Sequence, residues 1–182
     1  MWKFIKSSSD QSNWLIHDKK EICFIGRSNV GKSSLINALS NNSKLAKTSK
    51  TPGRTQLINY FDTNDKVIIV DLPGYGFANI SLSIQEKMFN MIDQYFQYSK
   101  PIYVFLLIDA RRGITEKDQT IIEHLTSLNH KIIFIVTKVD KAKQSEIAKT
   151  LKNDYFKNNK FFLSSISNKN KIEKIIKFIF EI

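Results

Sequence analysis

Apolar and polar positions follow two different periods along this chain. Short, nearly continuous apolar runs are typical of buried strands, and they occupy residues 21–25, 66–71, 103–109, 131–136 and 161–163. Between them, apolar residues recur every three or four positions, which indicates helices that cover a sheet. These helical segments are residues 33–39, 83–98, 115–128, 144–154 and a final segment around 172–179. The alternation predicts an α/β fold with about six strands, mostly parallel, and about five flanking helices.

One strand is expected to run against the others. Residues 56–62 and 66–71 are separated by a polar turn at residues 63–65, and so short a connection requires antiparallel pairing. The later connections are long enough for right-handed helical crossovers. Ser83 with Glu86, and Thr115 with Asp118, predict capping boxes at two helix starts. Residues 41–50 are polar and cationic, which predicts a mobile loop.

Length and composition predict a single domain. A chain of 182 residues, 42% of them hydrophobic, can bury one sizeable core, and we expect residues 1–20 to form an N-terminal extension to it. The single cysteine, Cys23, lies in a predicted strand, which fits a reducing compartment. No apolar run reaches 18 residues, and no apolar h-region follows Met1. The sequence therefore predicts a cytoplasmic protein that does not enter a membrane.

The chain is strongly basic. Its 28 lysines and arginines exceed its 17 aspartates and glutamates, which gives a formal charge of +11. Such a charge favours contact with a polyanion such as RNA, or with an anionic surface. The lysines are scattered over many predicted elements, however, and a charge of this size also serves solubility. Both interpretations stay open on charge alone.

A glycine-rich turn between the first predicted strand and the first predicted helix indicates phosphate binding. Gly26 and Gly31 let the backbone turn tightly, so that its N–H groups can face phosphate oxygens. Lys32 can reach the β- and γ-phosphates, and the Ser33 hydroxyl can bind Mg²⁺. The predicted nucleotide-binding residues of this loop are Gly26, Arg27, Ser28, Asn29, Val30, Gly31, Lys32, Ser33 and Ser34.

Two further loops can complete the phosphate and metal site. Asp71 ends a predicted strand, where an acid can hold Mg²⁺ through a water, and the Gly74 N–H can sense the γ-phosphate. Thr55 can join the Mg²⁺ ligands when a γ-phosphate is present, with Thr51 as the rival candidate. The binding residues predicted in these loops are Gly53, Arg54, Thr55, Asp71, Leu72, Pro73 and Gly74.

A fourth loop predicts that the base is guanine. The Asp140 carboxylate can accept hydrogen bonds from N1–H and the 2-amino group of guanine, which adenine cannot satisfy. Lys138 can lay its methylenes along the purine, and the loop at 164–166 can offer an N–H to the guanine carbonyl. The residues predicted to bind the base are Thr137, Lys138, Val139, Asp140, Ser164, Ser165 and Ile166. GTP and GDP are the predicted ligands; the alternative, a P-loop kinase or ATPase, lacks an identifiable acceptor site.

The hydrolytic machinery is predicted to be weak. After Gly74, where GTPases such as Ras carry a water-orienting glutamine, this chain has Tyr75. The predicted catalytic residues are Lys32, Thr55, Gly74 and Asn29. The Asn29 amide can help to coordinate a potassium ion beside the phosphates, as in other GTPases with asparagine at this spacing; alternatively, it braces the loop by a hydrogen bond to the backbone. We expect slow hydrolysis unless potassium or a partner assists.

The sequence resembles the EngB (YihA/YsxC) family of bacterial GTPases. Four segments carry the likeness: Gly-Arg-Ser-Asn-Val-Gly-Lys-Ser, Thr-Pro-Gly-Arg-Thr-Gln, Asp-Leu-Pro-Gly-Tyr-Gly-Phe-Ala and Thr-Lys-Val-Asp. The third of these, residues 71–78, is the most specific, and the likeness runs from about residue 21 to the C-terminus. The resemblance implies a P-loop GTPase, a G domain without circular permutation, that acts in assembly of the large ribosomal subunit, with a family link to cell division and septation.

The partners follow from the resemblance and the charge. We expect the large ribosomal subunit or its precursor, through rRNA and ribosomal proteins, and neither DNA nor a membrane; we also expect a monomer. The cationic residues predicted to face the partner are Lys44, Lys47, Lys50 and Arg54. A second hypothesis makes the protein a nucleotide-gated assembly module with little hydrolysis of its own. Multiple turnover without a partner would separate the two.

Overall fold

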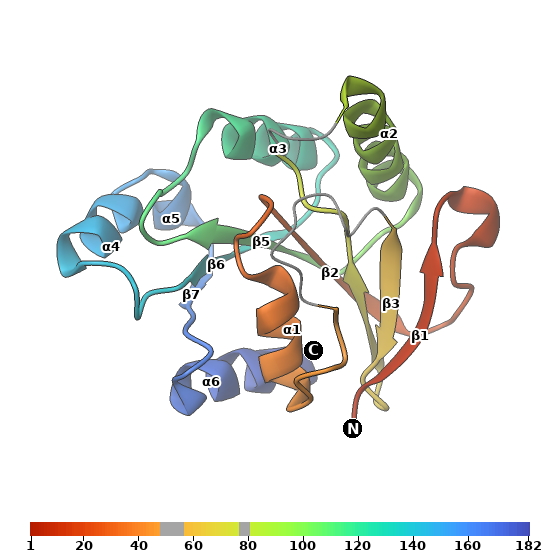
Figure 1. The fold of residues 1–182 in the computed structure, drawn as a ribbon, viewed down its shortest axis with the longest axis horizontal. Coiled ribbons are helices and arrows are strands. Elements are labelled where there is room, and N and C mark those ends of the chain that lie inside the picture. The colour runs from red at the N-terminus through yellow and green to blue at the C-terminus, as the bar shows by residue number, and fades with distance from the viewer. Residues whose placement is uncertain (48–56, 77–80) are drawn as a thin grey trace.

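The computed structural model describes residues 1–47, 57–76 and 81–182. In these ranges, seven strands form one sheet in the order β1-β3-β4-β2-β5-β6-β7, with helices on both faces (Figure 1). The strands are β1 (Lys3–Ser8), β2 (Lys20–Gly26), β3 (Ile58–Asp62), β4 (Val67–Asp71), β5 (Tyr103–Asp109), β6 (Ile132–Thr137) and β7 (Phe161–Leu163). The helices are α1 (Lys32–Ser40), α2 (Leu82–Tyr98), α3 (Glu116–Ser127), α4 (Gln144–Leu151), α5 (Tyr155–Asn158) and α6 (Lys169–Phe180), with a 3-10 turn at Gln11–Asn13.

The mostly parallel sheet with one antiparallel strand is confirmed. Strand β3 runs antiparallel to both of its neighbours, β1 and β4, while β2, β4, β5, β6 and β7 pair in parallel. The turn between β3 and β4 is as tight as predicted, and the Thr63 hydroxyl closes it by donating to the Val67 carbonyl at 2.7 Å. Among the described residues, no helix is long and apolar enough to cross a bilayer.

The strand count differs from the prediction, because the N-terminal extension supplies a seventh strand. Strand β1 pairs with β3, which lies more than fifty residues further along the chain, and a register shift interrupts the pairing between Phe4 and Lys6. An edge strand has one neighbour and a half-exposed face, so β1 lacks the continuous apolar run that marked the buried strands.

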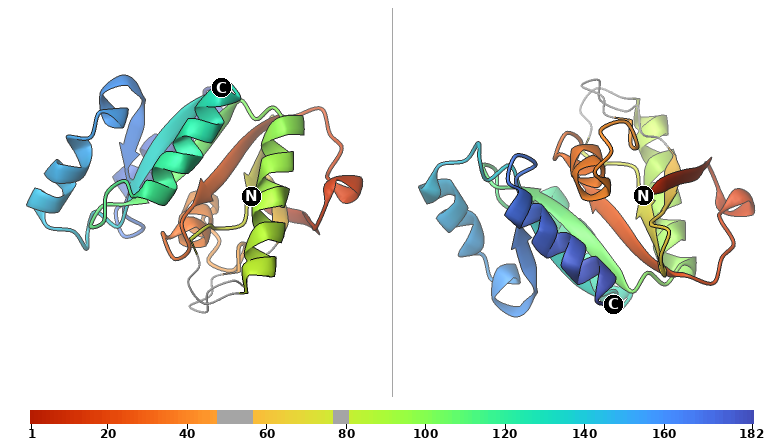
Figure 2. Two further views of the ribbon diagram at one scale, coloured as in Figure 1. Left: turned by 90° about the horizontal axis from the view of Figure 1, so that it is seen from above. Right: turned by 90° about the horizontal axis from the view of Figure 1, so that it is seen from below.

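Helices cover the two faces of the sheet in separate groups, as Figure 2 shows from above and below. On one face, α2, α3, α4 and α5 pack their apolar residues against Cys23, Val70 and Leu106. On the other face, α1 and α6 cover Phe24, Ile69 and other core residues. The helical spacing of apolar residues predicts inward faces of Met88, Ile92, Tyr95 and Phe96 on α2 and of Ile172, Ile175, Ile176 and Ile179 on α6. All of these residues are buried except Ile176, which is partly buried.

Two helix predictions were wrong in detail. Helix α2 begins at Leu82 without a side-chain cap, because the Ser83 hydroxyl bonds to that of Ser81 at 3.1 Å and no capping box with Glu86 forms. The helix predicted over 144–154 ends at Leu151 and resumes as the short α5. The Asn153 side chain accepts the Tyr155 N–H at 3.1 Å, and such a local bond competes with helical hydrogen bonding. The capping box of Thr115 and Asp118 is confirmed.

The predicted mobile loop is partly fastened to α1. The Asn37 side chain donates to the carbonyls of Ser43 and Ala46 at 3.0 Å and accepts the Ala46 N–H at 2.7 Å. Ala46 is buried. The described part of the loop, residues 41–47, therefore packs against the helix, while the remainder of the predicted loop lies outside the described residues.

Candidate nucleotide-binding site

The predicted phosphate loop lies where the strand order reverses. Strand β2, which leads into it, has β4 on one side and β5 on the other, and parallel open sheets bind ligands at such a point. Gly31 has φ 105°, and Asn29, at φ 61°, also lies in the left-handed region. A Cβ on Gly26 would lie 3.0 Å from the carbonyl oxygen of Leu107, so the loop can start against β5 only with glycine there.

The start of α1 presents the donors that a phosphate requires. The backbone N–H groups of Lys32, Ser33 and Ser34 occupy the first turn of α1, where helical N–H groups have no intrahelical acceptor. The half-buried Ser33 hydroxyl makes no hydrogen bond to the described part of the chain. N–H groups without intrahelical acceptors, next to a hydroxyl that bonds to none of the described residues, suit a phosphate with its Mg²⁺.

Lys32 and Asp71, predicted to serve the phosphates and the metal, are in direct contact. The Lys32 ammonium donates to a carboxylate oxygen of Asp71, and both side chains are almost fully buried, at 7% and 2% exposed. Asp71 closes β4 and Lys32 opens α1, so the sheet and the helix bring residues 39 positions apart into one ion pair. The pair places the predicted phosphate ligand beside the predicted metal ligand.

The loop after β4 is joined to the phosphate loop by backbone hydrogen bonds. The Ser28 N–H donates to the Tyr75 carbonyl at 2.8 Å, and the Tyr75 N–H donates to the Gly26 carbonyl at 3.2 Å. A Cβ on Gly74 would lie 3.3 Å from the Ser28 nitrogen, so glycine permits this close approach. The side chain of Leu72, predicted as a binding residue, packs in the core. Movement of residues 74–75 must therefore break contacts with the phosphate loop.

The loop after β6 also holds the phosphate loop. The buried Thr137 hydroxyl donates to the Val30 carbonyl at 2.7 Å. The Lys138 ammonium donates to the Asn29 carbonyl at 2.5 Å, and Lys138 adopts φ 58°. The methylenes of Lys138 pass over the loop, since its Cε lies 3.6 Å from a Cβ built on Gly31. The predicted purine-facing side chain is thus anchored to the loop that faces the phosphates.

The two predicted base-binding loops meet. The Val139 N–H donates to the Ser164 carbonyl at 3.3 Å, and the Ser164 N–H donates to the Val136 carbonyl at 2.7 Å. Ser165 is buried with its hydroxyl bonded to that of Ser167 at 2.8 Å, whereas Ile166 is exposed. The exposed Asp140 carboxylate makes no hydrogen bond to the described residues. Its acceptor oxygens remain available for a base.

Some predicted residues cannot be placed. Gly53, Arg54, Thr55 and the rival Thr51 lie outside the described residues. The third predicted Mg²⁺ ligand, Thr55 or its rival Thr51, is therefore untested and stays a prediction, as do the binding roles of Gly53 and Arg54.

Comparison with known proteins places the chain in a family. Residues 21–138 match the family model described as 50S ribosome-binding GTPase. The chain is 58% identical over 147 residues to the probable GTP-binding protein EngB of Metamycoplasma arthritidis, covering 80% of each protein. It is 45% identical to the protein of that name from Fusobacterium nucleatum, covering 98% of this chain and 94% of that one. The chain belongs to the EngB family of GTP-binding proteins.

The fold agrees with this membership. A crystal structure of a probable GTP-binding protein EngB superimposes with a TM-score of 0.71 at 28% identity, over 88% of this chain and 97% of that one. The predicted P-loop GTPase fold and the family resemblance are both confirmed. A P-loop kinase or ATPase, the alternative left open by the sequence, receives no support.

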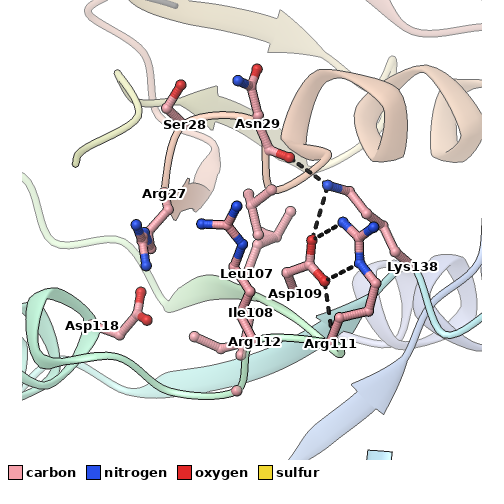
Figure 3. A pocket seen from close by; sticks show the side chains of 12 residues that line it. Arg27, Ser28, Asn29, Leu107, Ile108, Asp109, Arg111, Arg112, Asp118 and Lys138 are labelled. Carbon is pink, nitrogen blue, oxygen red and sulfur yellow. Dashed lines mark hydrogen bonds and ion pairs between the residues drawn. The ribbon is translucent and has the colours of Figure 1, made fainter. Parts of the chain in front are cut away.

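Sequence reasoning missed a buried carboxylate in this EngB-family site. Asp109, at the end of β5, accepts two hydrogen bonds from the Arg111 guanidinium, at 2.9 and 2.7 Å, and one from Lys138 at 3.0 Å (Figure 3). Burial disfavours its charged form, but these bonds outweigh burial and hold the pKa of Asp109 well below its ordinary value. Its position at the carboxyl end of a central strand was the available signal. Asp109 orients Lys138, and through it the Asn29 carbonyl.

Tyr75 has a role that its sequence position did not reveal. Its ring is buried, and its hydroxyl donates to Asp118 at 2.6 Å. Burial, together with the Asp118 charge, raises the pKa of the Tyr75 phenol far above its usual value. The same carboxylate caps α3 through Thr115. The phenol thus binds α3, while the backbone of Tyr75 binds the phosphate loop.

We expect Tyr75→Phe to lower the free energy of unfolding by about 1.5–3 kcal/mol, because the buried Asp118 carboxylate loses one charge-assisted donor. Denaturant unfolding measures this loss, with Tyr98→Phe, at an exposed ring, as the matched control. Multiple-turnover GTP hydrolysis should persist, since the hydroxyl is committed to α3. Loss of turnover at unchanged stability would instead assign the phenol to catalysis.

Proposed function

We propose that this EngB-family protein is a slow, Mg²⁺-dependent GTPase that acts as a switch in assembly of the large ribosomal subunit. The observation that carries the switch is the pair of backbone hydrogen bonds between Tyr75 and the phosphate loop, at Ser28 and Gly26. Contacts around a γ-phosphate order or release such segments in GTPases. The segment at Gly74 and Tyr75 after β4 is hydrogen-bonded directly to the phosphate loop. Its position can therefore change with the bound nucleotide.

The residues of the chain have separate roles in this proposal. Lys32 and the amides of α1 hold the phosphates, while Ser33 and Asp71, the latter through a water, hold Mg²⁺; Thr55 completes that set. Bound Mg²⁺ would neutralise charge on the phosphates. The Gly74 N–H senses the γ-phosphate, and Asp140 selects guanine. Asn29 and Lys32 face the charge that develops during hydrolysis.

The proposed partner is the large ribosomal subunit or its precursor, contacted through rRNA and ribosomal proteins. The matching family description names ribosome binding, and the charge of +11 favours RNA. Lys44 and Lys47 are exposed on the packed part of the loop after α1, as a partner contact requires, while Lys50 and Arg54 lie outside the described residues. Participation in cell division and septation, a cytoplasmic location and a monomeric state complete the proposal.

Co-sedimentation with purified large subunits tests this function. We expect the protein to pellet with subunits when loaded with a non-hydrolysable GTP analogue, to remain in the supernatant with GDP, and to dissociate steeply as salt rises. Binding that ignores both nucleotide and salt would contradict the switch. If binding follows the nucleotide but multiple turnover is absent, the nucleotide-gated assembly module becomes the better description.

A second expected result concerns potassium. The Asn29 side chain is exposed and makes no hydrogen bond to described residues, which favours an outward-facing ligand over a loop brace (Figure 3). We expect hydrolysis to be several-fold faster in potassium than in sodium at equal ionic strength, because a cation can neutralise transition-state charge. Asn29→Ala should abolish the difference while GDP affinity stays within about twofold. Equal rates of the unaltered protein in both salts would leave activation to the partner.

A further inference from the structure

A cationic cavity lies between the phosphate loop and the loop after β5. It has a volume of about 150 Å³, roughly ten times the minimum for one water, so a phosphate group has room there. Arg27, Ser28 and Asn29 line it from the phosphate loop, and Asp109, Arg112 and Asp118 line it from the opposite side (Figure 3). The cavity shares Arg27, Ser28, Asn29 and Lys138 with the predicted nucleotide site, but Lys32, Ser33 and Ser34 at the start of α1 do not line it.

Cationic side chains around this cavity outnumber the carboxylates. The Asp109 carboxylate forms ion pairs with Arg111 and Lys138. Both oxygens of Asp118 accept hydrogen bonds, one from the Tyr75 hydroxyl and the other from Thr115. Asp109 is therefore paired with two cations, whereas the donors to Asp118 are uncharged.

The lining carries four cationic side chains, those of Arg27, Arg111, Arg112 and Lys138, against the two carboxylates of Asp109 and Asp118, so the cavity has an excess of positive charge. Figure 3 shows the guanidinium groups of Arg27 and Arg112 at the cavity, with the Asp118 carboxylate below that of Arg27 in this view. Neither arginine forms an ion pair with any described residue. Cationic side chains in excess of the carboxylates around one cavity favour the binding of an anion there. Planar guanidinium groups bind phosphate oxygens in a bidentate fashion, so the arrangement suits a phosphate.

The cationic surface continues beyond the cavity. Gly76 lies between Arg27 and Lys117, since a Cβ built on it would be 3.5 Å from the Arg27 Nε and 3.5 Å from the Lys117 Cδ. Lys117 is exposed on α3 and also forms no ion pair within the described ranges. Several cations on one surface, Arg27, Arg112 and Lys117, suit the repeated charges of a nucleic acid backbone better than they suit a ligand with a single carboxylate, and the net charge of +11 attracts a polyanion from a distance.

We propose that Arg27 and Arg112 form a phosphate site for the backbone of RNA, on the outer side of the nucleotide-binding loop. The choice of RNA as the polyanion rests on the proposed ribosomal function. The site lies beside the bonded pair of Tyr75 and Asp118, so the bound RNA contacts the segment whose position depends on the nucleotide.

Fluorescence anisotropy with a labelled single-stranded RNA tests the site. Arg112→Ala in the full chain should weaken RNA binding about tenfold or more, as expected for a lost charge-assisted contact, and lower the salt slope by about 0.7. Arg27→Ala should act in the same direction. Lys174→Ala, on α6 at the other face of the sheet, removes the same charge and should change affinity less than threefold. Equal losses for Arg112→Ala and Lys174→Ala would overturn the site.

Two further measurements identify the ligand. Arg112→Ala should leave GDP affinity unchanged, which shows that the nucleotide site is intact. Titration with inorganic phosphate, followed by NMR of the arginine Nε–H groups, should shift Arg27 and Arg112 weakly, while RNA shifts them at far lower concentration. A response to phosphate without one to RNA, or to a polyglutamate peptide in place of RNA, would overturn the RNA assignment.

Failure of this site and failure of the proposed function give different results. Nucleotide-dependent co-sedimentation with large subunits that is equal for Arg112→Ala and Lys174→Ala would refute the site and leave the function standing. RNA binding that depends on Arg112 in a protein that never pellets with subunits would support the site and refute the ribosomal role.

Discussion

Lys32→Ala should both weaken nucleotide binding and destabilise the protein. We expect GDP and GTP to bind about 10- to 100-fold more weakly, because a charged donor to the phosphates is lost. In the protein without nucleotide, the free energy of unfolding should fall by about 3–5 kcal/mol, because the Asp71 carboxyl group, 2% exposed, is left in a buried position without its cationic partner. Nucleotide titration and denaturant unfolding measure the two effects separately.

The double variant Lys32→Ala/Asp71→Asn separates the two consequences. Removing the carboxylate charge should restore most of the lost stability, whereas nucleotide affinity should stay low, since neither the phosphate donor nor the metal ligand is present. If the double variant is as unstable as the single one, the buried ion pair does not account for the loss. Full recovery of GDP affinity would contradict the role of Lys32 at the phosphates.

Asp140→Asn should change the preferred base. The amide presents a donor where guanine N1–H needs an acceptor, so GTP binding should weaken by at least about 2 kcal/mol, or about 30-fold. Xanthosine triphosphate should gain affinity, because its base offers an acceptor to the new amide. The exposed Asp140 carboxylate makes no hydrogen bond to described residues, so the substitution should leave stability unaltered.

Asp65→Asn provides the matched control, since Asp65 is an exposed carboxylate at the opposite end of β4, in the turn that follows β3. Competition binding with GTP, ATP and xanthosine triphosphate measures the preference of each variant. Unchanged GTP affinity in Asp140→Asn, or a loss as large in Asp65→Asn, would remove Asp140 from the base site.

The sequence alone determined the class of fold and the positions of the chemical groups. The apolar runs predicted five of the seven strands, because buried strands of a parallel sheet are apolar on both faces, and the segment 56–62 before the polar turn predicted a sixth. The three-residue turn at 63–65 determined the antiparallel pairing of β3 and β4. The nucleotide-binding motifs each followed a predicted strand. Because the carboxyl ends of parallel strands lie at one edge of the sheet, the sequence placed these motifs close together. Local chemistry was enough for these conclusions.

Only the tertiary structure decided which side chains contact one another. The seventh strand depends on pairing between segments more than fifty residues apart, which no local period encodes. Tyr75 and Asp118 are 43 positions apart in the sequence, and Asn29 and Lys138 are 109 positions apart. The packing of helices on the sheet brings both pairs into hydrogen-bonding contact. Charge composition gave a net value of +11, but only the fold separated Arg111, which pairs with Asp109, from Arg27 and Arg112, which form no ion pair within the described ranges. Ion pairing depends on distances of a few ångströms, and those distances are set by tertiary packing.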